Sequence, residues 1–141
     1  MSVEITSKVA GKRILVHKIR KKAERILKLL NQNQAELSLA LVENREIQEL
    51  NARYRSKNEP TDVLSFPSGG ILPKGEKLLG DVVISIEQAE RQARKRGKRL
   101  DEEVEALLIH GILHLLGYDH ERSPKEAKIM GGMEKKVRRG L

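Results

Sequence analysis

Two kinds of apolar pattern alternate along this chain. In residues 11–30 apolar side chains recur every three to four positions, which predicts an amphipathic helix with a basic outer face. In residues 36–42 apolar and polar positions alternate, which predicts a half-buried strand. Val82, Val83 and Ile84 run together, a pattern typical of a strand covered on both faces. The pattern therefore predicts a protein that contains both helices and strands.

The same patterns predict the helices and strands in the rest of the chain. Further helices are expected at 43–54, 86–96, 100–116 and 123–139, and further strands at 2–6, 63–66 and 80–85. Pro67 should close the third strand, and the glycine-containing segment 68–79 should be a mobile surface loop. Because no repeat or long linker divides the chain, we expect residues 1–141 to form a single α+β domain, in which a small mixed β-sheet of about four strands packs with about five helices.

Composition narrows the possible chemistry. Aromatic residues make up only 2% of the 141, so the core must be aliphatic, and base-stacking platforms of the single-strand-binding type are disfavoured. Cysteine is absent, so a metal site would have to use His, Asp or Glu ligands. No signal-peptide pattern and no stretch long enough to span a bilayer is seen, so we expect a soluble, cytoplasmic protein with no membrane partner.

The charge balance is strongly basic. Lys and Arg number 28 against 20 Asp and Glu, for a formal net charge of +8. Such an excess favours a polyanionic partner such as RNA, but a charge-rich solvated surface gives the same balance. Charge alone does not decide between these two interpretations.

Three of the four histidines lie within eleven residues, 110–120. His110 and His114 are four apart, which places both imidazoles on one face of a helix and within reach of one metal ion. Gly117 can end that helix in a left-handed conformation and allow His120 to return as a third ligand. The spacing therefore predicts a metal site formed by His110, His114 and His120.

Three neutral imidazoles with an open fourth position are typical of a catalytic rather than a structural metal, so hydrolysis is the expected reaction class. The spacing HxxxHxxGxxH is that of metzincin proteases, but Gly111 stands where those enzymes carry a general-base glutamate. This weakens a protease function and favours phosphodiester cleavage, which depends more on charge stabilisation. Asp119 and Glu121 flank His120; they either assist the chemistry or are ordinary loop carboxylates.

Four segments together resemble the YbeY family of bacterial endoribonucleases: Asn51–Arg55, Pro60–Pro67, Leu79–Ser85 and His110–His120. The resemblance covers roughly residues 40 to 135. It implies a single-domain α+β fold with a metzincin-like zinc-site helix, one zinc ion per chain on the three histidines, and a catalytic role for Arg55. It also implies a part in ribosomal RNA maturation, notably at the 3′ end of the small-subunit (16S) rRNA, and in ribosome quality control.

Our hypothesis is a zinc-dependent endoribonuclease specific for single-stranded RNA. His114 and Arg55 are the candidate catalytic residues, and Arg55 would hold a phosphate. The expected partners are ribosomal RNA and the ribosome or its small-subunit proteins, and the basic stretch 91–99 is expected to contact the RNA backbone. Attack by a metal-bound water and attack by the RNA 2′-hydroxyl both remain open, as do two alternatives: a metalloprotease-like peptidase, and a non-catalytic zinc-containing ribosome assembly factor.

Overall fold

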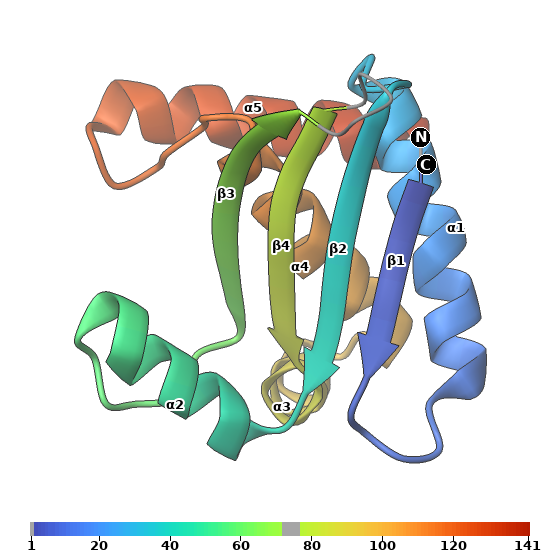
Figure 1. Cartoon of the computed structure of the whole chain (residues 1–141), viewed down its shortest axis with the longest axis vertical. Coiled ribbons are helices and arrows are strands. Elements are labelled where there is room, and N and C mark those ends of the chain that lie inside the picture. Colours follow the sequence, from blue (N-terminus) through green and yellow to red (C-terminus); the bar gives the residue numbers. More distant parts are fainter. Residues whose placement is uncertain (1, 72–76) are drawn as a thin grey trace.

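The computed structural model describes residues 2–71 and 77–141 (Figure 1). Its elements in chain order are β1 (Ser2–Ser7), α1 (Arg13–Leu29), β2 (Ala35–Val42), α2 (Asn44–Arg55), β3 (Val63–Ile71), β4 (Lys77–Ser85), α3 (Ile86–Arg96), α4 (Leu100–Leu115) and α5 (Pro124–Gly140). The predicted α+β class, with four strands and five helices, is confirmed for these residues. Within residues 2–71 and 77–141, no helix is long and apolar enough to cross a membrane.

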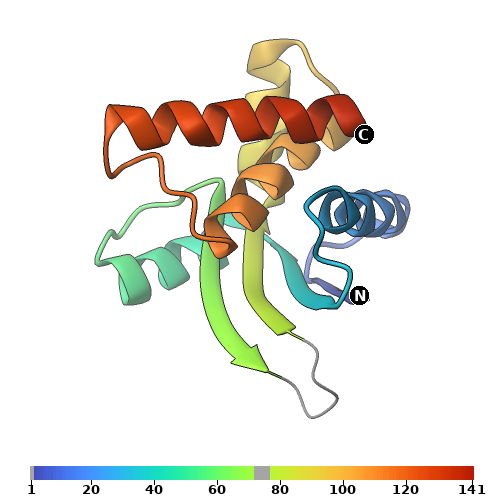
Figure 2. The same ribbon diagram turned by 90° about the horizontal axis from the view of Figure 1, so that it is seen from above.

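The strands form one mixed sheet in the order β1-β2-β4-β3. β1, β2 and β4 are parallel, and β3 pairs with β4 in the antiparallel direction as an edge strand. Helices α1, α4 and α5 lie over one face of this sheet (Figure 2). Leu39 and Val82 face that layer and join a core with Leu108 and Ile112 of α4, which is wholly aliphatic apart from Met130 among its buried members. The sheet therefore gives α4 a rigid support.

The edge strand β3 is longer than the sequence pattern predicts. The predicted end at Pro67 is wrong, because β3 continues to Ile71 and β4 begins at Lys77. Proline has no N–H to donate, and on an edge strand this loss is tolerated. The pairing shifts register between Pro67 and Gly70, and Gly80 opposite Pro67 has a φ of 139°. The ends of the predicted mobile loop are thus strands, and its centre, 72–76, lies outside the described residues.

Helix α2 packs on the other face of the sheet. Leu64 and Val83 point away from the main core and form a second, smaller buried cluster with Ile47 of α2. Phe66 packs against the same cluster. This packing holds α2 against the part of the sheet formed by β3 and β4.

The first turn of α4 is held by ion pairs. Asp101 accepts a hydrogen bond from Arg99 at 3.2 Å and lies 3.8 Å from Lys18 of α1. Burial raises the pKa of the Asp101 carboxyl, but the charges and hydrogen bond of Arg99, together with Lys18 and Lys22, outweigh burial and hold the pKa below its ordinary value. The ionised form of Asp101 therefore stabilises the fold at neutral pH.

A second pair joins α3 to α4. The Glu103 carboxylate is fully buried, and both of its oxygens accept from Arg96, at 2.9 and 3.2 Å. A buried carboxylate needs such a partner, so this pair fixes the start of α4 in position.

Candidate metal centre

The C-terminal half of α4 carries the histidine pair. His110 and His114 lie one turn apart on a helix that ends at Leu115, one residue before the predicted end. Gly117 has a φ of 100°, and the amide of Tyr118 donates to the carbonyl of Leu113 at 3.1 Å, which closes the helix end. The chain then reverses and brings His120 back toward the pair, as the glycine predicts.

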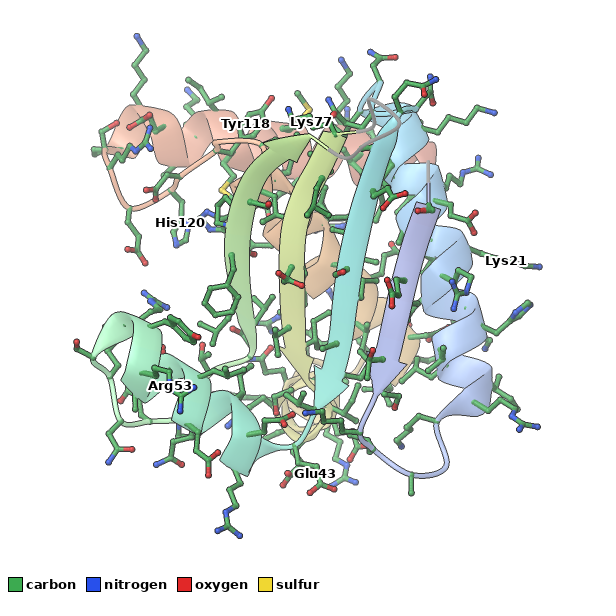
Figure 3. All side chains as sticks on the ribbon, viewed as in Figure 1. Lys21, Glu43, Arg53, Lys77, Tyr118 and His120 are labelled. Carbon is green, nitrogen blue, oxygen red and sulfur yellow. The ribbon has the colours of Figure 1, made fainter. Side chains whose placement is uncertain are left out.

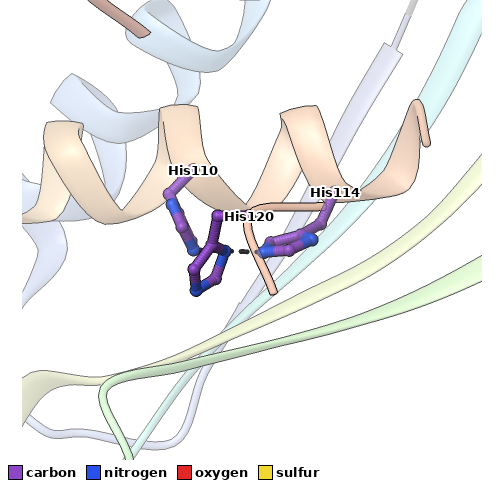
Figure 4. Close-up of side chains that lie close together, drawn as sticks. All are labelled: His110, His114 and His120. Atoms are coloured by element: carbon purple, nitrogen blue, oxygen red, sulfur yellow. Dashed lines mark hydrogen bonds between the residues drawn. The ribbon is translucent and has the colours of Figure 1, made fainter. Parts of the chain in front are cut away.

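The three imidazoles surround one point (Figure 4). The Nε2 atoms of His110 and His114 are 3.1 Å apart. The ring centroid of His120 lies 5.0 Å from that of His110 and 5.3 Å from that of His114. One nitrogen from each ring lies within 4.8 Å of the others, so the group could hold a metal ion. His110 and His114 are partly buried and His120 is exposed, so the site is open to solvent on one side.

Glu134 of α5 is a functional candidate that the sequence analysis missed. Its carboxylate lies 3.2 Å from Nδ1 of His110. An Nδ1–H that donates to this carboxylate leaves Nε2 of His110 with a free lone pair that points at the common centre. Helical spacing is the sequence signal that could have identified Glu134. Glu134 lies four residues after the buried Met130 and three before the buried Val137, so its carboxylate is on the buried face of a largely basic helix.

The electrostatics favour the neutral imidazole at His114. Burial lowers the pKa of His114, and the nearby His110 and His120 lower it further. In the following loop, the pKa of Asp119 is lowered mainly because the amide of Glu121 donates to its carboxylate at 2.9 Å. This hydrogen bond shapes the turn that presents His120.

Arg55 ends α2 at the same edge of the sheet. One guanidinium nitrogen lies 3.9 Å from Oε1 of Glu121, and that same oxygen lies 3.9 Å from Nε2 of His120. Figure 3 shows both His120 and Arg53, which precedes Arg55 by two residues, on the outer side of the edge strand β3, with His120 higher in the view and Arg53 lower, on α2. The structure thus brings Arg55, predicted only from resemblance, to the open side of the histidine group.

Gly111 faces the sheet. A Cβ atom at this position would lie 2.8 Å from Cγ1 of Val82 and 3.2 Å from Oγ of Ser65. The Ser65 hydroxyl also donates to the Gly111 carbonyl at 3.0 Å. Where metzincins carry a glutamate, this chain therefore has no room for a side chain.

The basic stretch 91–99 is not brought to the histidines. Residues 91–96 form the second half of α3 and residues 97–99 lead into α4, and His114 lies fourteen residues beyond the start of α4. At 1.5 Å per residue the separation is about 20 Å. Contact of this stretch with an RNA backbone stays a prediction, and it concerns a surface distant from the histidines.

A mixed sheet supports a helix that carries HxxxH, and a third histidine returns after a glycine turn, so the chain has the histidine arrangement of a single-metal hydrolase and a group that could hold one metal ion. The sequence model of the family described as "Endoribonuclease YbeY" matches residues 4–141 of this chain. The chain belongs to the YbeY family.

Individual relatives agree with this assignment. The chain is 50% identical over 130 residues to an endoribonuclease YbeY of Aquifex aeolicus, covering 92% of this chain and 86% of the relative. It is 46% identical over 133 residues to that of a Sulfurihydrogenibium species, covering 94% and 88%. The fold is similar to the solution structure of a Thermotoga maritima protein, with a TM-score of 0.66 and 31% identity over 96% of this chain and 85% of the other.

Proposed function

We propose that this chain is a zinc-dependent endoribonuclease that cleaves single-stranded RNA, and that residues 1–141 act as one hydrolase domain. The family membership supports the nuclease activity, because its relatives are named endoribonucleases. The observation that carries the metal dependence is the convergence of three imidazole nitrogens within 4.8 Å at an open surface.

The donor set suits zinc. Two nitrogens that each bind a tetrahedral zinc ion at 2.0–2.1 Å are about 3.3 Å apart, and the Nε2 atoms of His110 and His114 are separated by 3.1 Å. His120 would supply the third ligand, and the Glu134 carboxylate, by accepting from Nδ1–H of His110, would hold this ring in the tautomer that metal binding requires. When bound, the ion would stabilise negative charge on the phosphoryl oxygens and lower the pKa of a coordinated water.

Arg55 is proposed to hold the scissile phosphate. Its contact with Glu121 is long, at 3.9 Å, and both side chains are substantially exposed, so the pair is weak. A phosphate offers a guanidinium two oxygens and a larger charge than a carboxylate, so it can replace Glu121 as the partner. This exchange would place the phosphate between Arg55 and the three histidines.

The close packing of Gly111 against the sheet argues against a peptidase. Peptide hydrolysis must deliver a proton to the leaving amine, which metzincins do with the glutamate at this position. Because Val82 and Ser65 fill the space next to Gly111, this chain cannot accept that residue without moving α4. Phosphodiester cleavage is less dependent on such a base.

Two routes of attack fit the site, and the products separate them. A 2′,3′-cyclic phosphate with a 5′-hydroxyl on the other fragment indicates attack by the RNA 2′-hydroxyl, whereas a 5′-phosphate with a 3′-hydroxyl indicates attack by water. Chemical analysis of the fragment ends therefore defines the nucleophile.

We propose ribosomal RNA as the natural substrate, at the 3′ end of the small-subunit (16S) rRNA and in ribosome quality control, from the resemblance given above. This places the protein in the cytoplasm with the ribosome or its small-subunit proteins as partners. The net charge of +8 supports binding to a polyanion of this kind.

The test compares cleavage of single-stranded ribosomal RNA by the wild type, His114→Ala and His17→Ala, all purified identically, with and without chelator. His17 is the fourth histidine and lies exposed on α1, so its variant is the matched control. We expect wild type and His17→Ala to cleave, and His114→Ala and all chelated samples to be inactive.

Equal cleavage in every sample would contradict the proposal, because the cleavage would then depend neither on a metal ion nor on His114. RNA binding without cleavage by zinc-loaded wild type would instead favour a non-catalytic assembly factor whose zinc holds the fold. That alternative also predicts that removal of the metal strongly lowers the melting temperature.

A further inference from the structure

Two of the three aromatic residues in this chain meet where the end of α2 lies against β3. The rings of Tyr54 and Phe66 have centroids 5.2 Å apart and planes inclined at 65°, an edge-to-face pair. Phe66 is partly buried against the sheet, whereas Tyr54 is 60% exposed. The pair thus presents an apolar ring surface to solvent, held in place from below.

Both rings are attached to segments that form the site. Tyr54 immediately precedes Arg55, whose guanidinium reaches Glu121 in the loop that carries His120. Phe66 follows Ser65 on β3: the Ser65 hydroxyl donates to the Gly111 carbonyl of α4 on one face of the sheet, and Phe66 packs on the opposite face, toward α2. The ring pair therefore lies on the α2 side of the edge strand β3, and Tyr54 directly precedes the arginine that reaches the loop of His120.

The surroundings of Tyr54 are cationic. Arg53, Arg55 and Lys57 are all exposed and lie within three residues of it, at the end of α2. An aromatic face among cations is the combination that binds single-stranded nucleic acid: the cations contact phosphates and the ring stacks on a base. A role in packing does not explain Tyr54, because most of its side chain contacts solvent. The low aromatic content argues against an extended platform, but not against one base.

We propose that Tyr54, supported edge-on by Phe66, is a stacking subsite for one unpaired base of the RNA, adjacent to the phosphate that Arg55 holds. This inference rests on the proposed function and deepens it. A base within a duplex stacks on its neighbours on both faces, so it cannot offer a face to Tyr54 without unpairing. The subsite would therefore contribute to the preference for single strands.

The test measures binding, so that it does not depend on cleavage. The full chain with His114→Ala is titrated with a fluorescent RNA of about ten nucleotides and with an abasic ribose-phosphate chain of the same length and charge. Added Tyr54→Ala should weaken binding of the RNA by about fivefold or more and leave binding of the abasic chain unchanged. Tyr54→Phe, which keeps the ring, should bind both as the parent does.

Ile14→Ala is the control, because Ile14 is an apolar side chain 74% exposed on α1, far from the site. It should change neither affinity, and circular dichroism should show that every variant is folded. If Tyr54→Ala weakens both ligands equally, if Tyr54→Phe behaves like Tyr54→Ala, or if the parent does not bind the RNA, the stacking subsite is refuted. Tyr54-dependent binding of RNA that zinc-loaded wild type never cleaves would refute the proposed activity and leave the subsite intact.

Discussion

A single methyl group added to α4 at position 111 tests how closely the helix must approach the sheet. In Gly111→Ala the new Cβ would lie 2.8 Å from Cγ1 of Val82. Carbon atoms in contact normally lie about 3.5–4.0 Å apart, so helix and sheet must separate by roughly 0.7 Å or more. Such overpacking costs about 1–3 kcal/mol.

The loss of stability from overpacking must be separated from the gain that alanine gives in a helix, which is about 1 kcal/mol relative to glycine. Gly132→Ala provides the control, because Gly132 lies inside α5 and a Cβ there meets nothing within 4 Å. Gly132→Ala should be stabilising by about 1 kcal/mol, and Gly111→Ala should be neutral to destabilising by about 2 kcal/mol. The two variants should thus differ by about 1–3 kcal/mol.

The assay is urea and thermal unfolding of chelator-treated protein, followed by circular dichroism, so that metal binding does not contribute. For a chain of this length 1 kcal/mol corresponds to about 3 °C in Tm, so the variants should melt roughly 3–10 °C apart. A zinc competition assay on the same proteins should show weaker binding only for Gly111→Ala, because α4 carries two of the ligands. Equal stabilisation by both alanines would refute the argument from close approach.

Three further predictions concern the site and its support. Glu134→Gln should lower the zinc affinity about 10–100-fold without unfolding the protein, because it weakens the hydrogen bond that orients His110. Competition with a chromophoric chelator measures the zinc affinity, and an unchanged affinity would contradict the prediction. Arg55→Ala should reduce the rate of RNA cleavage at least about tenfold while zinc binding and folding stay normal. Arg53→Ala is the control and should have a smaller effect, because Arg53 has no contact to the histidine loop among the described residues. Steady-state cleavage rates measure both effects, and equal effects would contradict a special role for Arg55. Asp101 has a folded-state pKa below its unfolded value, so its ionised form adds stability that is present above pH about 4 and lost as pH falls through the lowered folded value. Asp101→Asn should therefore lower the free energy of unfolding by about 0.5–1 kcal/mol at pH 7 and by progressively less below pH 4. Urea unfolding at pH 7 and below pH 4 measures this loss, and a loss that does not change with pH would contradict the role of the Asp101 charge.

The parts of the site that follow from local geometry were predictable from the sequence. The spacing of His110 and His114 determines their common face once the segment is helical, and Gly117 predicts the reversal that returns His120. Most helix and strand limits are likewise set by local apolar patterns, and they agree with the structure to within one or two residues.

The parts that depend on tertiary contacts were not predictable in the same way. Glu134 lies on the next helix and reaches His110 only because α5 packs across α4. Arg55 was found by resemblance, since no local rule places the end of α2 beside the loop of His120. The extension of β3 past Pro67 depends on its edge position, and a local pattern cannot distinguish an edge strand from a central one.

The three ligands of the proposed metal site differ in how firmly the chain holds them. His110 and His114 are in position as soon as α4 forms, whereas His120 sits on an exposed loop whose backbone must be ordered to reach them. The conformational entropy of that loop thus enters the binding free energy of the ion. Metal affinity in this chain is therefore also a measure of loop order, and a substitution that loosens residues 117–123 will weaken metal binding although every ligand is retained.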